Sequence, residues 1–167
     1  MRRRYNKDRV LSLIREIRRN IEGVTFTTDL MVGFPGEDEE DFLETVDFVK
    51  EARLLDAHVF AYSKRDATPA AYFDGQIPEC VKRERSARLI EEKNKVRDAL
   101  LSRIISEGRE LSVIAESYSS GYYTAHSKEY IEVSFASECK ELSGEMLTVI
   151  PVSHKNGVVN AILKDKK

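Results

Sequence analysis

TTDLMVGFPGE, at residues 27–37, is the stretch that decides the expected fold. A strand-like apolar run ends here in a Gly-Phe-Pro-Gly turn, and an acidic helix start follows from Asp38 to Asp41. In α/β proteins, ligands gather at the carboxyl ends of such strands. Gly33 and Gly36 allow a ligand to approach the backbone closely, because glycine has no side chain in the way. The stretch therefore predicts a fragment of an α/β enzyme with a cofactor at this turn.

The residues around this turn predict alternating helices and strands. Apolar residues recur with helical spacing between positions 6 and 21, and Asn6 is a suitable N-cap. Residues 24–32 and 56–62 are expected to be strands buried on both faces, with a helix from about Asp38 between them. This order predicts a parallel sheet with right-handed crossovers. In such strands Asp29 should pair with a core arginine or bind a polar ligand, and His58 should be a core or strand-end histidine.

The second half of the chain has a different pattern. A long charged helix is expected from about Pro78 to Ile105. After Gly108, residues 110–116, 122–135, 144–152 and 158–163 are expected to be strands, and Asn156-Gly157 predicts a hairpin. Short strands of this kind indicate a small antiparallel β-barrel. The expected domains are residues 1–77, a linker helix at 78–107, and a barrel at 108–167.

Composition excludes several classes of protein. The 167 residues carry a net charge of −2, so nothing draws the whole chain to nucleic acid. The basic cluster of Lys82, Arg83, Arg85 and Arg88 is interpreted as a solvated helix face. Cys80 and Cys139 have no metal-site spacing, and no apolar run is long enough for a membrane helix. We therefore expect a cytoplasmic chain with no membrane partner, no metal ligands and no catalytic residue of its own.

Four short motifs occur in a diagnostic order. They are MRRRY at residues 1–5, the stretch at 27–37, HVFAYSKR at 58–65, and Thr68-Pro69-Ala70. Together they resemble the C-terminal half of a radical S-adenosylmethionine (SAM) methylthiotransferase. Residues 83–89 resemble the linker helix of this family, and residues 108–167 resemble its TRAM domain, an OB-like barrel that binds tRNA. The implied fold is the last part of a (β/α) radical-SAM barrel, a long linker helix, and a TRAM barrel.

The resemblance implies radical chemistry that this chain cannot perform alone. Family members carry one iron–sulfur cluster in an N-terminal domain and a second [4Fe-4S] cluster on a CxxxCxxC motif. They form a radical from SAM and insert a methylthio group into a C–H bond. The chain has neither the motif nor that domain, so we expect it to be inactive alone. Its implied partners are tRNA, through the anticodon stem-loop, and the missing N-terminal half. An incomplete barrel also exposes a sheet edge, which predicts self-association.

The matching motifs assign two groups of residues. On the cofactor side, the resemblance points to Gly33, Phe34, Pro35 and Gly36, and to Arg3, which either reaches the SAM carboxylate or supports the barrel. For substrate and RNA it points to Tyr62, Ser63, Arg65, Tyr122, Tyr123, Lys128 and Tyr130. The chain departs from the family pattern where Ala61, Lys64 and Asp66-Ala67 replace proline-containing positions. These replacements weaken any specific role assigned to that loop.

The substrate implied by the resemblance is an adenosine next to the tRNA anticodon. The linker helix and Gly121-Tyr122-Tyr123-Thr124 resemble most the branch that acts on N6-threonylcarbamoyladenosine. The isopentenyladenosine branch is the second candidate, and the branch that modifies a ribosomal protein is the third. A non-catalytic RNA-binding module is the alternative from a different functional class.

Overall fold

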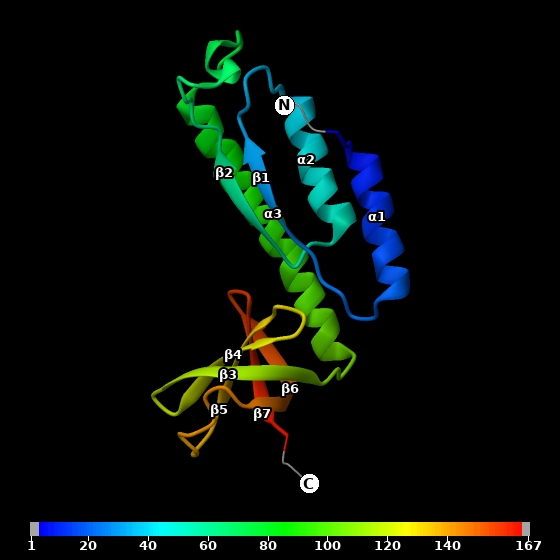
Figure 1. The fold of residues 1–167 in the computed structure, drawn as a ribbon, viewed down its shortest axis with the longest axis vertical. Coiled ribbons are helices and arrows are strands. Elements are labelled where there is room, and N and C mark those ends of the chain that lie inside the picture. Colours follow the sequence, from blue (N-terminus) through cyan, green and yellow to red (C-terminus); the bar gives the residue numbers. More distant parts are fainter. Residues whose placement is uncertain (1–3, 165–167) are drawn as a thin grey trace. The chain divides into compact units, whose positions relative to one another are not determined.

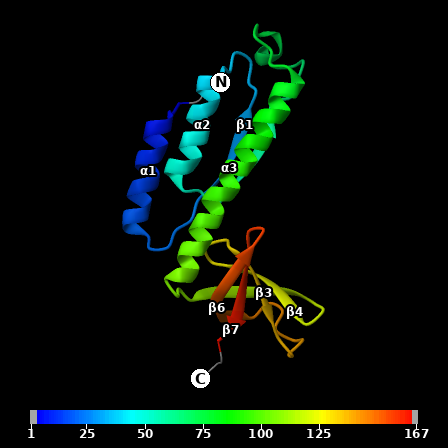
Figure 2. The ribbon, with the colours of Figure 1, turned by 180° about the vertical axis from the view of Figure 1, so that it is seen from behind.

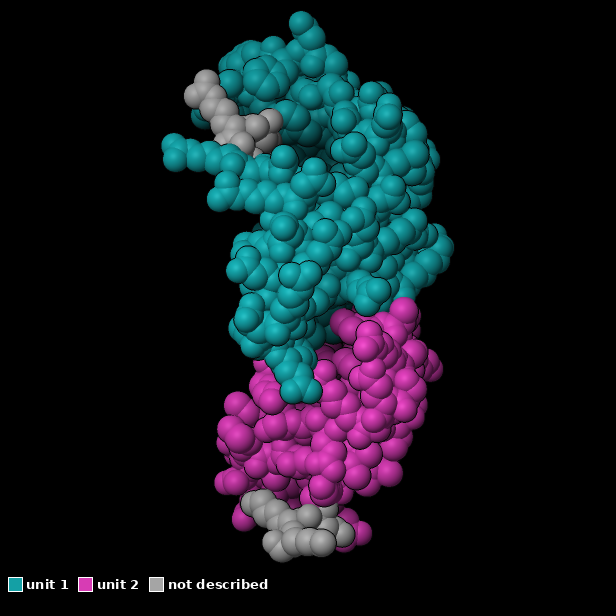
Figure 3. Space-filling model, turned by 90° about the vertical axis from the view of Figure 1, so that its right-hand side faces the viewer, with its two compact units in different colours: residues 1–96 teal, residues 97–167 magenta. Residues whose placement is uncertain are grey.

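The structure is a computed structural model that describes residues 4–164. The chain forms two compact units, residues 1–96 and 97–167, which Figure 3 shows in different colours. The first unit contains α1 (Lys7–Asn20), β1 (Thr27–Val32), α2 (Glu39–Ala52), β2 (Asp56–Ala61) and the 3₁₀ turn η1 (Pro69–Tyr72). Helix α3 (Glu79–Ser106) begins in the first unit and ends in the second. The second unit continues with β3 (Leu111–Ser119), β4 (Tyr122–Ser127), β5 (Glu132–Ala136), β6 (Met146–Lys155) and β7 (Val158–Leu163).

The first unit has the predicted α-β-α-β order, and its two strands are parallel. Thr27 of β1 stands beside Asp56 of β2, and the register continues to Val32 and Ala61. Figure 1 shows the two strands side by side. Helices α1, α2 and α3 all contribute to one core with the sheet, whose fully or almost fully buried members include Leu11, Ile14, Val32, Phe42, Val46, Val49, Ala57 and Leu89.

The prediction that both strands are buried on both faces is wrong. Residues 27 and 29 of β1 and residues 56 and 58 of β2 are exposed, while their neighbours pack toward the helices. The reason is that the helices cover one face of a sheet with only two strands. Asp29 and His58 stand opposite each other on the open face. The expectations of a core arginine partner for Asp29 and of a core position for His58 are therefore also wrong.

Two helix starts form as the sequence predicts. The Asn6 side chain accepts a hydrogen bond from the Arg9 N–H at 3.0 Å. At the start of α2, Asp38 accepts from the Asp41 N–H at 2.9 Å, and the Asp41 carboxylate accepts from the Asp38 N–H at 3.2 Å. This reciprocal capping box satisfies two backbone donors that the first turn of a helix leaves free. It also fixes where the chain changes from the turn after β1 into α2.

The second unit is a closed barrel with the strand order β3-β4-β5-β7-β6 (Figure 2). Alternate residues point inward, and the core includes Leu111, Val113, Tyr123, Val133, Phe135, Val149 and Val159. The predicted hairpin at Asn156-Gly157 is confirmed, since it joins the antiparallel strands β6 and β7. Both residues have positive φ angles, 52° and 86°, as the favoured two-residue hairpin turns require. The barrel is not wholly antiparallel, because β5 and β7 pair in parallel.

The single strand expected at residues 122–135 is in fact two strands, β4 and β5, joined by a tight turn. Tyr130 takes a left-handed φ of 66°, and its N–H bonds to the Ser127 carbonyl at 2.9 Å. The Ser127 hydroxyl accepts from the N–H groups of Glu129 and Ile131 at 3.2 and 3.3 Å. The sequence Ser-Lys-Glu-Tyr has no glycine, proline or asparagine, and its one turn residue, Ser127, is a weaker turn signal than these. Among the residues described, no helix has the length and apolar character needed to cross a membrane.

Candidate functional site

The Gly-Phe-Pro-Gly-Glu segment is a tight turn at the carboxyl end of β1. The Glu37 N–H donates to the Phe34 carbonyl at 2.9 Å, with Pro35 and Gly36 between them. Gly36 has a φ of +85°, as the third residue of a type II turn requires. A second support comes from the loop after η1, where the Gly75 carbonyl accepts from the Gly36 N–H at 2.9 Å. The turn is thus held in one backbone conformation.

Aromatic side chains fix the apolar side of the turn. The Phe34 ring lies edge-on to Tyr62 at 5.4 Å and to Phe73 at 6.3 Å between centroids. Tyr62 is only 7% exposed, and its N–H continues the pairing of the strands by donating to the Val32 carbonyl at 2.8 Å. Of the residues expected to contact substrate in this region, Tyr62 is therefore a core residue, whereas Ser63 and Arg65 are exposed in the loop that follows.

A cavity of about 380 Å³ lies beside the turn, lined by Met31, Phe34, Pro35, Gly36, Glu37, Asp41 and Thr45. A side chain at Gly36 would meet no atom within 4 Å, so the backbone here is accessible. This volume is in the range of small-molecule sites. Three of the four predicted cofactor residues in this turn, Phe34, Pro35 and Gly36, line the cavity, whereas Gly33 is buried against Lys82 of α3. Arg3, the other predicted cofactor residue, lies outside the described residues.

The structure offers no place for an iron–sulfur cluster within residues 4–164. No group of three or more His, Cys, Asp or Glu side chains comes together there in a way that could hold a metal ion. Cys80 and Cys139 are both exposed, and neither forms a disulfide. The described residues thus form a cavity beside the turn and contain no set of side chains that would hold a cluster.

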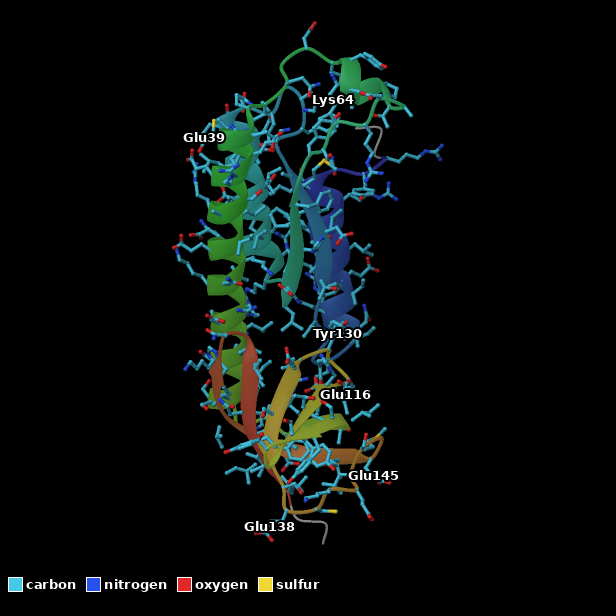
Figure 4. All side chains as sticks on the ribbon, turned by 90° about the vertical axis from the view of Figure 1, so that its left-hand side faces the viewer. Glu39, Lys64, Glu116, Tyr130, Glu138 and Glu145 are labelled. Carbon is cyan, nitrogen blue, oxygen red and sulfur yellow. The ribbon has the colours of Figure 1, made fainter. Side chains whose placement is uncertain are left out.

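Two basic residues beneath the turn were misinterpreted from the sequence. Lys82 and Arg85, expected on a solvated face of the long helix, are 5% and 6% exposed. Both lie on α3. Lys82 donates to the Tyr62 carbonyl and packs against Gly33, and Arg85 donates to the Glu37 carbonyl. Arg88, one turn further along, is more exposed and bonds to Glu39 at 2.8 Å; this hydrogen bond raises the pKa of Arg88. Figure 4 labels Glu39 at the start of α2, beside α3. The clue in the sequence was the three-residue spacing of Lys82, Arg85 and Arg88, which places all three on one side of a helix.

The barrel separates the predicted RNA-binding residues into two groups. Tyr122 and Tyr130 are 56% and 71% exposed, and Lys128 is exposed beside Tyr130. Tyr123 instead lies fully inside the barrel, stacked on Phe135 at 5.5 Å. Its hydroxyl accepts from the Leu142 N–H at 2.9 Å. The ring of Tyr123 is therefore part of the barrel core, and the exposed tyrosines are the ones available for contact.

His126 adds to the exposed group, although the sequence gave no reason to select it. Its ring lies 5.5 Å from that of Tyr130, and its Nδ1 is 2.9 Å from a Glu116 carboxylate oxygen. Figure 4 labels Tyr130 and Glu116 on the barrel. Inside the same turn, the Glu129 carboxylate bonds to Arg109 at 2.7 Å. These contacts fix the residues on either side of Tyr130, and its own ring is exposed with the His126 ring as its neighbour.

Comparison with known proteins identifies relatives along nearly the whole chain, although no protein-family model matches it. The chain is 39% identical over 159 residues to the tRNA-2-methylthio-N(6)-dimethylallyladenosine synthase of Clostridium botulinum (strain Eklund 17B / Type B), covering 93% of the chain and 34% of that protein. With the Clostridioides difficile synthase of the same name it shares 35% identity over 169 residues, 98% of the chain and 34% of the relative. The chain is homologous to tRNA methylthiotransferases.

The homology extends over both units but not over the whole of these methylthiotransferases. A third synthase of this name, from Acetivibrio thermocellus, is 43% identical over 109 residues, which is 63% of the chain and 23% of that protein. The chain spans about a third of the length of the curated relatives it matches. The family expected from the sequence motifs therefore agrees with the relatives that are found.

Proposed function

We propose that this chain is the part of a radical-SAM tRNA methylthiotransferase that holds one edge of the SAM site and the tRNA-binding barrel. The observation that carries the proposal is that 93% and 98% of the chain align with two tRNA-2-methylthio-N(6)-dimethylallyladenosine synthases, at 39% and 35% identity. The turn at residues 33–37 and the exposed tyrosines of the barrel give this similarity a physical basis. In this proposal the first unit is the end of the radical-SAM barrel and the second unit is a TRAM domain.

The substrate we propose is N6-dimethylallyladenosine, also called isopentenyladenosine, in tRNA. The relatives carry this nucleoside in their printed name. They favour the second candidate of the sequence analysis over the threonylcarbamoyladenosine branch, which none of the reported relatives supports. The sequence preference for that branch depended on short segments, residues 85–89 and 121–124, whereas the relatives align over nearly the whole chain.

For the cofactor, the proposal gives this chain a binding role. Bound SAM would supply the radical that removes hydrogen from the substrate, with the [4Fe-4S] clusters held by residues outside this chain. The turn from Gly33 to Gly36 would present backbone C=O groups and the Phe34 ring to the adenosyl part. The capping box at Asp38 would keep α2 in place behind the turn. The open face of β1 and β2 would be covered by the remaining strands of the barrel.

The decisive experiment uses the full-length gene that encodes this chain. It would be expressed in a bacterial strain that lacks its own tRNA methylthiotransferases, and the tRNA nucleosides would be separated and identified by mass spectrometry. We expect 2-methylthio-N6-dimethylallyladenosine to appear. A methylthio group on threonylcarbamoyladenosine instead would assign the other branch, and tRNA without any methylthio product would leave only the RNA-binding module.

Binding of tRNA by the barrel can be measured with the chain itself. Stacking of a base on an aromatic ring contributes about 1–3 kcal/mol, so Tyr130→Ala should weaken binding of an anticodon stem-loop about tenfold. Ile162→Ala, on β7, removes an equally exposed apolar side chain and serves as the matched control. Lys128→Ala should reduce the dependence of binding on salt, because fewer phosphate contacts release fewer counterions. Equal affinity of all three variants and the unchanged chain would remove the tyrosine surface from the proposal.

Self-association is proposed from the same open sheet. In the part of the chain that the structure describes, strands β1 and β2 pair only with each other, so each has a free edge there. Free edges pair readily with other strands. Light scattering of the chain should show a mass that rises with concentration, and Thr27→Lys, at an exposed position of β1, should reduce that rise. A constant monomer mass over a wide concentration range would contradict this.

A further inference from the structure

The two buried cations of α3 have no ordinary structural explanation. A buried charge is costly unless it is paired and hydrogen-bonded, and a well-packed apolar pair is often as stable or more so. The Nε of Arg85 is buried and makes no hydrogen bond to any residue from 4 to 164, which adds to the cost. A helix that only needed to cover the sheet would be more stable with leucine or methionine at positions 82 and 85. What these two side chains bind is therefore informative.

Lys82 supports the beginning of the turn. Its Nζ donates to the Tyr62 carbonyl at 3.0 Å and to a Glu79 carboxylate oxygen at 2.7 Å, and it lies 5.5 Å from the centre of the Tyr62 ring. Its Cγ is 2.4 Å from where a Cβ of residue 33 would be. The aliphatic part of Lys82 thus fills the space that glycine leaves at the start of the turn. Any larger residue at position 33 would displace it.

Arg85 supports the end of the turn and, through Glu37, also its start. Its Nη1 donates to the Glu37 carbonyl at 3.0 Å and to Glu37 Oε1 at 2.7 Å. The other carboxylate oxygen of Glu37 accepts from the Gly33 N–H at 2.9 Å. One guanidinium therefore fixes a carboxylate that in turn binds the backbone four residues earlier. Both ends of the five-residue turn are connected to one helix by charge-assisted hydrogen bonds, which are the stronger kind.

We propose that Lys82 and Arg85 are positioning residues for the SAM-binding turn, an inference that rests on the function proposed above. They touch no reacting atom. They fix the backbone of residues 33–37 from below, so that its free groups face the cavity in one arrangement. Binding sites need such support, because an error of about 1 Å in a contact group is enough to weaken a site strongly. The hydrogen bonds of these two charged side chains are directional, so they fix the orientation of the groups that they bind, which an apolar contact does not.

The first test measures the turn in this chain and does not depend on catalysis. Amide hydrogen exchange, followed by NMR, would be compared for Arg85→Gln and Arg88→Gln. Arg88 is the matched control, because it is on the same helix and binds Glu39 and Glu84 but no residue of the turn. Losing a hydrogen bond to a charged group shifts a local opening equilibrium by about tenfold or more. Because Arg85→Gln removes the charged partner of Glu37, hydrogen exchange at the Gly33 amide should become at least about tenfold faster. Exchange at Val46 and Val49 of α2 should stay the same.

If Arg85→Gln does not fold, Arg85→Lys replaces it, since one ammonium can make the two bonds that Nη1 makes. The Gly33 amide should then exchange faster than in the unchanged chain but more slowly than an amide that makes no hydrogen bond. Unchanged exchange at Gly33 in a folded variant would overturn the proposal. So would a uniform loss of protection throughout the first unit, because that would show a role in stability alone.

The second test uses the full-length protein that contains this chain. Arg85→Gln should raise the KM for SAM about tenfold, leave the KM for tRNA unchanged, and be partly rescued by Arg85→Lys. Arg88→Gln should change neither constant. Equal changes in both KM values, or a loss of kcat alone, would overturn the positioning role. If the unmutated full-length protein makes no methylthio product, the proposed function is contradicted. The exchange test still shows whether Arg85 fixes the turn.

Discussion

The two units of this protein solve the same problem of sheet edges in opposite ways. In the first, β1 and β2 pair only with each other among residues 4–164, and one face of the sheet carries exposed residues such as Asp29 and His58. In the second, five strands close into a barrel in which every strand has two neighbours. The closed barrel completes its own hydrogen bonding, whereas the open pair leaves backbone groups unpaired at both edges. The comparison indicates that the barrel strands complete their pairing within the second unit, whereas the two-stranded sheet of the first unit keeps two open edges among residues 4–164.

The units also differ in how they use buried polar groups. The barrel has an apolar core of alternating residues with one aromatic centre, Tyr123 against Tyr118 and Phe135. The first unit combines an apolar core with the buried cations Lys82 and Arg85 at its functional turn. The barrel also buries a charge, Glu129, which is 7% exposed and bonds to Arg109 at 2.7 Å in the turn after β4, whereas the first unit buries its two cations against the turn that is proposed to hold a cofactor. The three predictions below test these differences.

The largest effect is expected from Tyr123→Ala in the barrel. The substitution removes a fully buried ring and the acceptor of the Leu142 N–H, and large-to-small changes of this kind cost about 3–5 kcal/mol. Urea unfolding followed by NMR should show the barrel signals lost at lower urea while those of the first unit are unchanged. Tyr122→Ala, at the exposed neighbouring position, should change stability by less than about 0.5 kcal/mol. Simultaneous loss of both units would show that they do not unfold independently.

A smaller but more specific difference is expected between two glycines of the turn. Gly33 and Gly36 have similar φ angles, +73° and +85°, so alanine at either pays about 1–2 kcal/mol of backbone strain. Only at position 33 would the new Cβ also collide with Lys82, and overpacking costs about 1–3 kcal/mol more. Chemical denaturation should therefore rank Gly33→Ala below Gly36→Ala in stability. Equal values would mean that Lys82 moves aside freely and does not support the turn.

The smallest effect is expected on the surface of α3. The hydrogen bond from Lys95, followed by the charges of Lys95 and Lys50, lowers the pKa of Glu92. A lowered folded-state pKa contributes stability at neutral pH that is lost as the pH falls through that pKa. Glu92→Gln should cost a few tenths of a kcal/mol at neutral pH, about what an exposed helical pair contributes. The difference should begin to shrink as the pH falls through the ordinary glutamate pKa, about 4.3, and should vanish only below the lowered folded-state pKa. A difference that persists in acid would exclude the charge as its cause.

Much of the fold could be predicted from local patterns. The apolar spacing of residues 7–20, the acidic start of α2 and the Asn156-Gly157 hairpin each contain their own signal, and each forms where expected. The turn at residues 127–131 was not predicted, because it depends on the Ser127 hydroxyl, a weak turn signal, and on a left-handed Tyr130, a conformation that a tyrosine does not indicate in the sequence. The exposure of Thr27 and Asp29 in β1 was also not predicted, because the burial of a strand face depends on which elements pack against it, and the strand's own sequence does not contain that information.

The sequence by itself determined that residues 33–37 form a tight turn, since Pro35 fixes its own φ and the two glycines can adopt the positive φ that the turn needs. It also indicated the methylthiotransferase family, through motifs that relatives over nearly the whole chain now support. Only the tertiary structure decided which charges hold that turn and which tyrosines are exposed. Lys82 and Arg88 look alike in the sequence, and so do Tyr122 and Tyr123. Their burial is set by what the rest of the chain packs against them, and this depends on contacts between residues far apart in sequence.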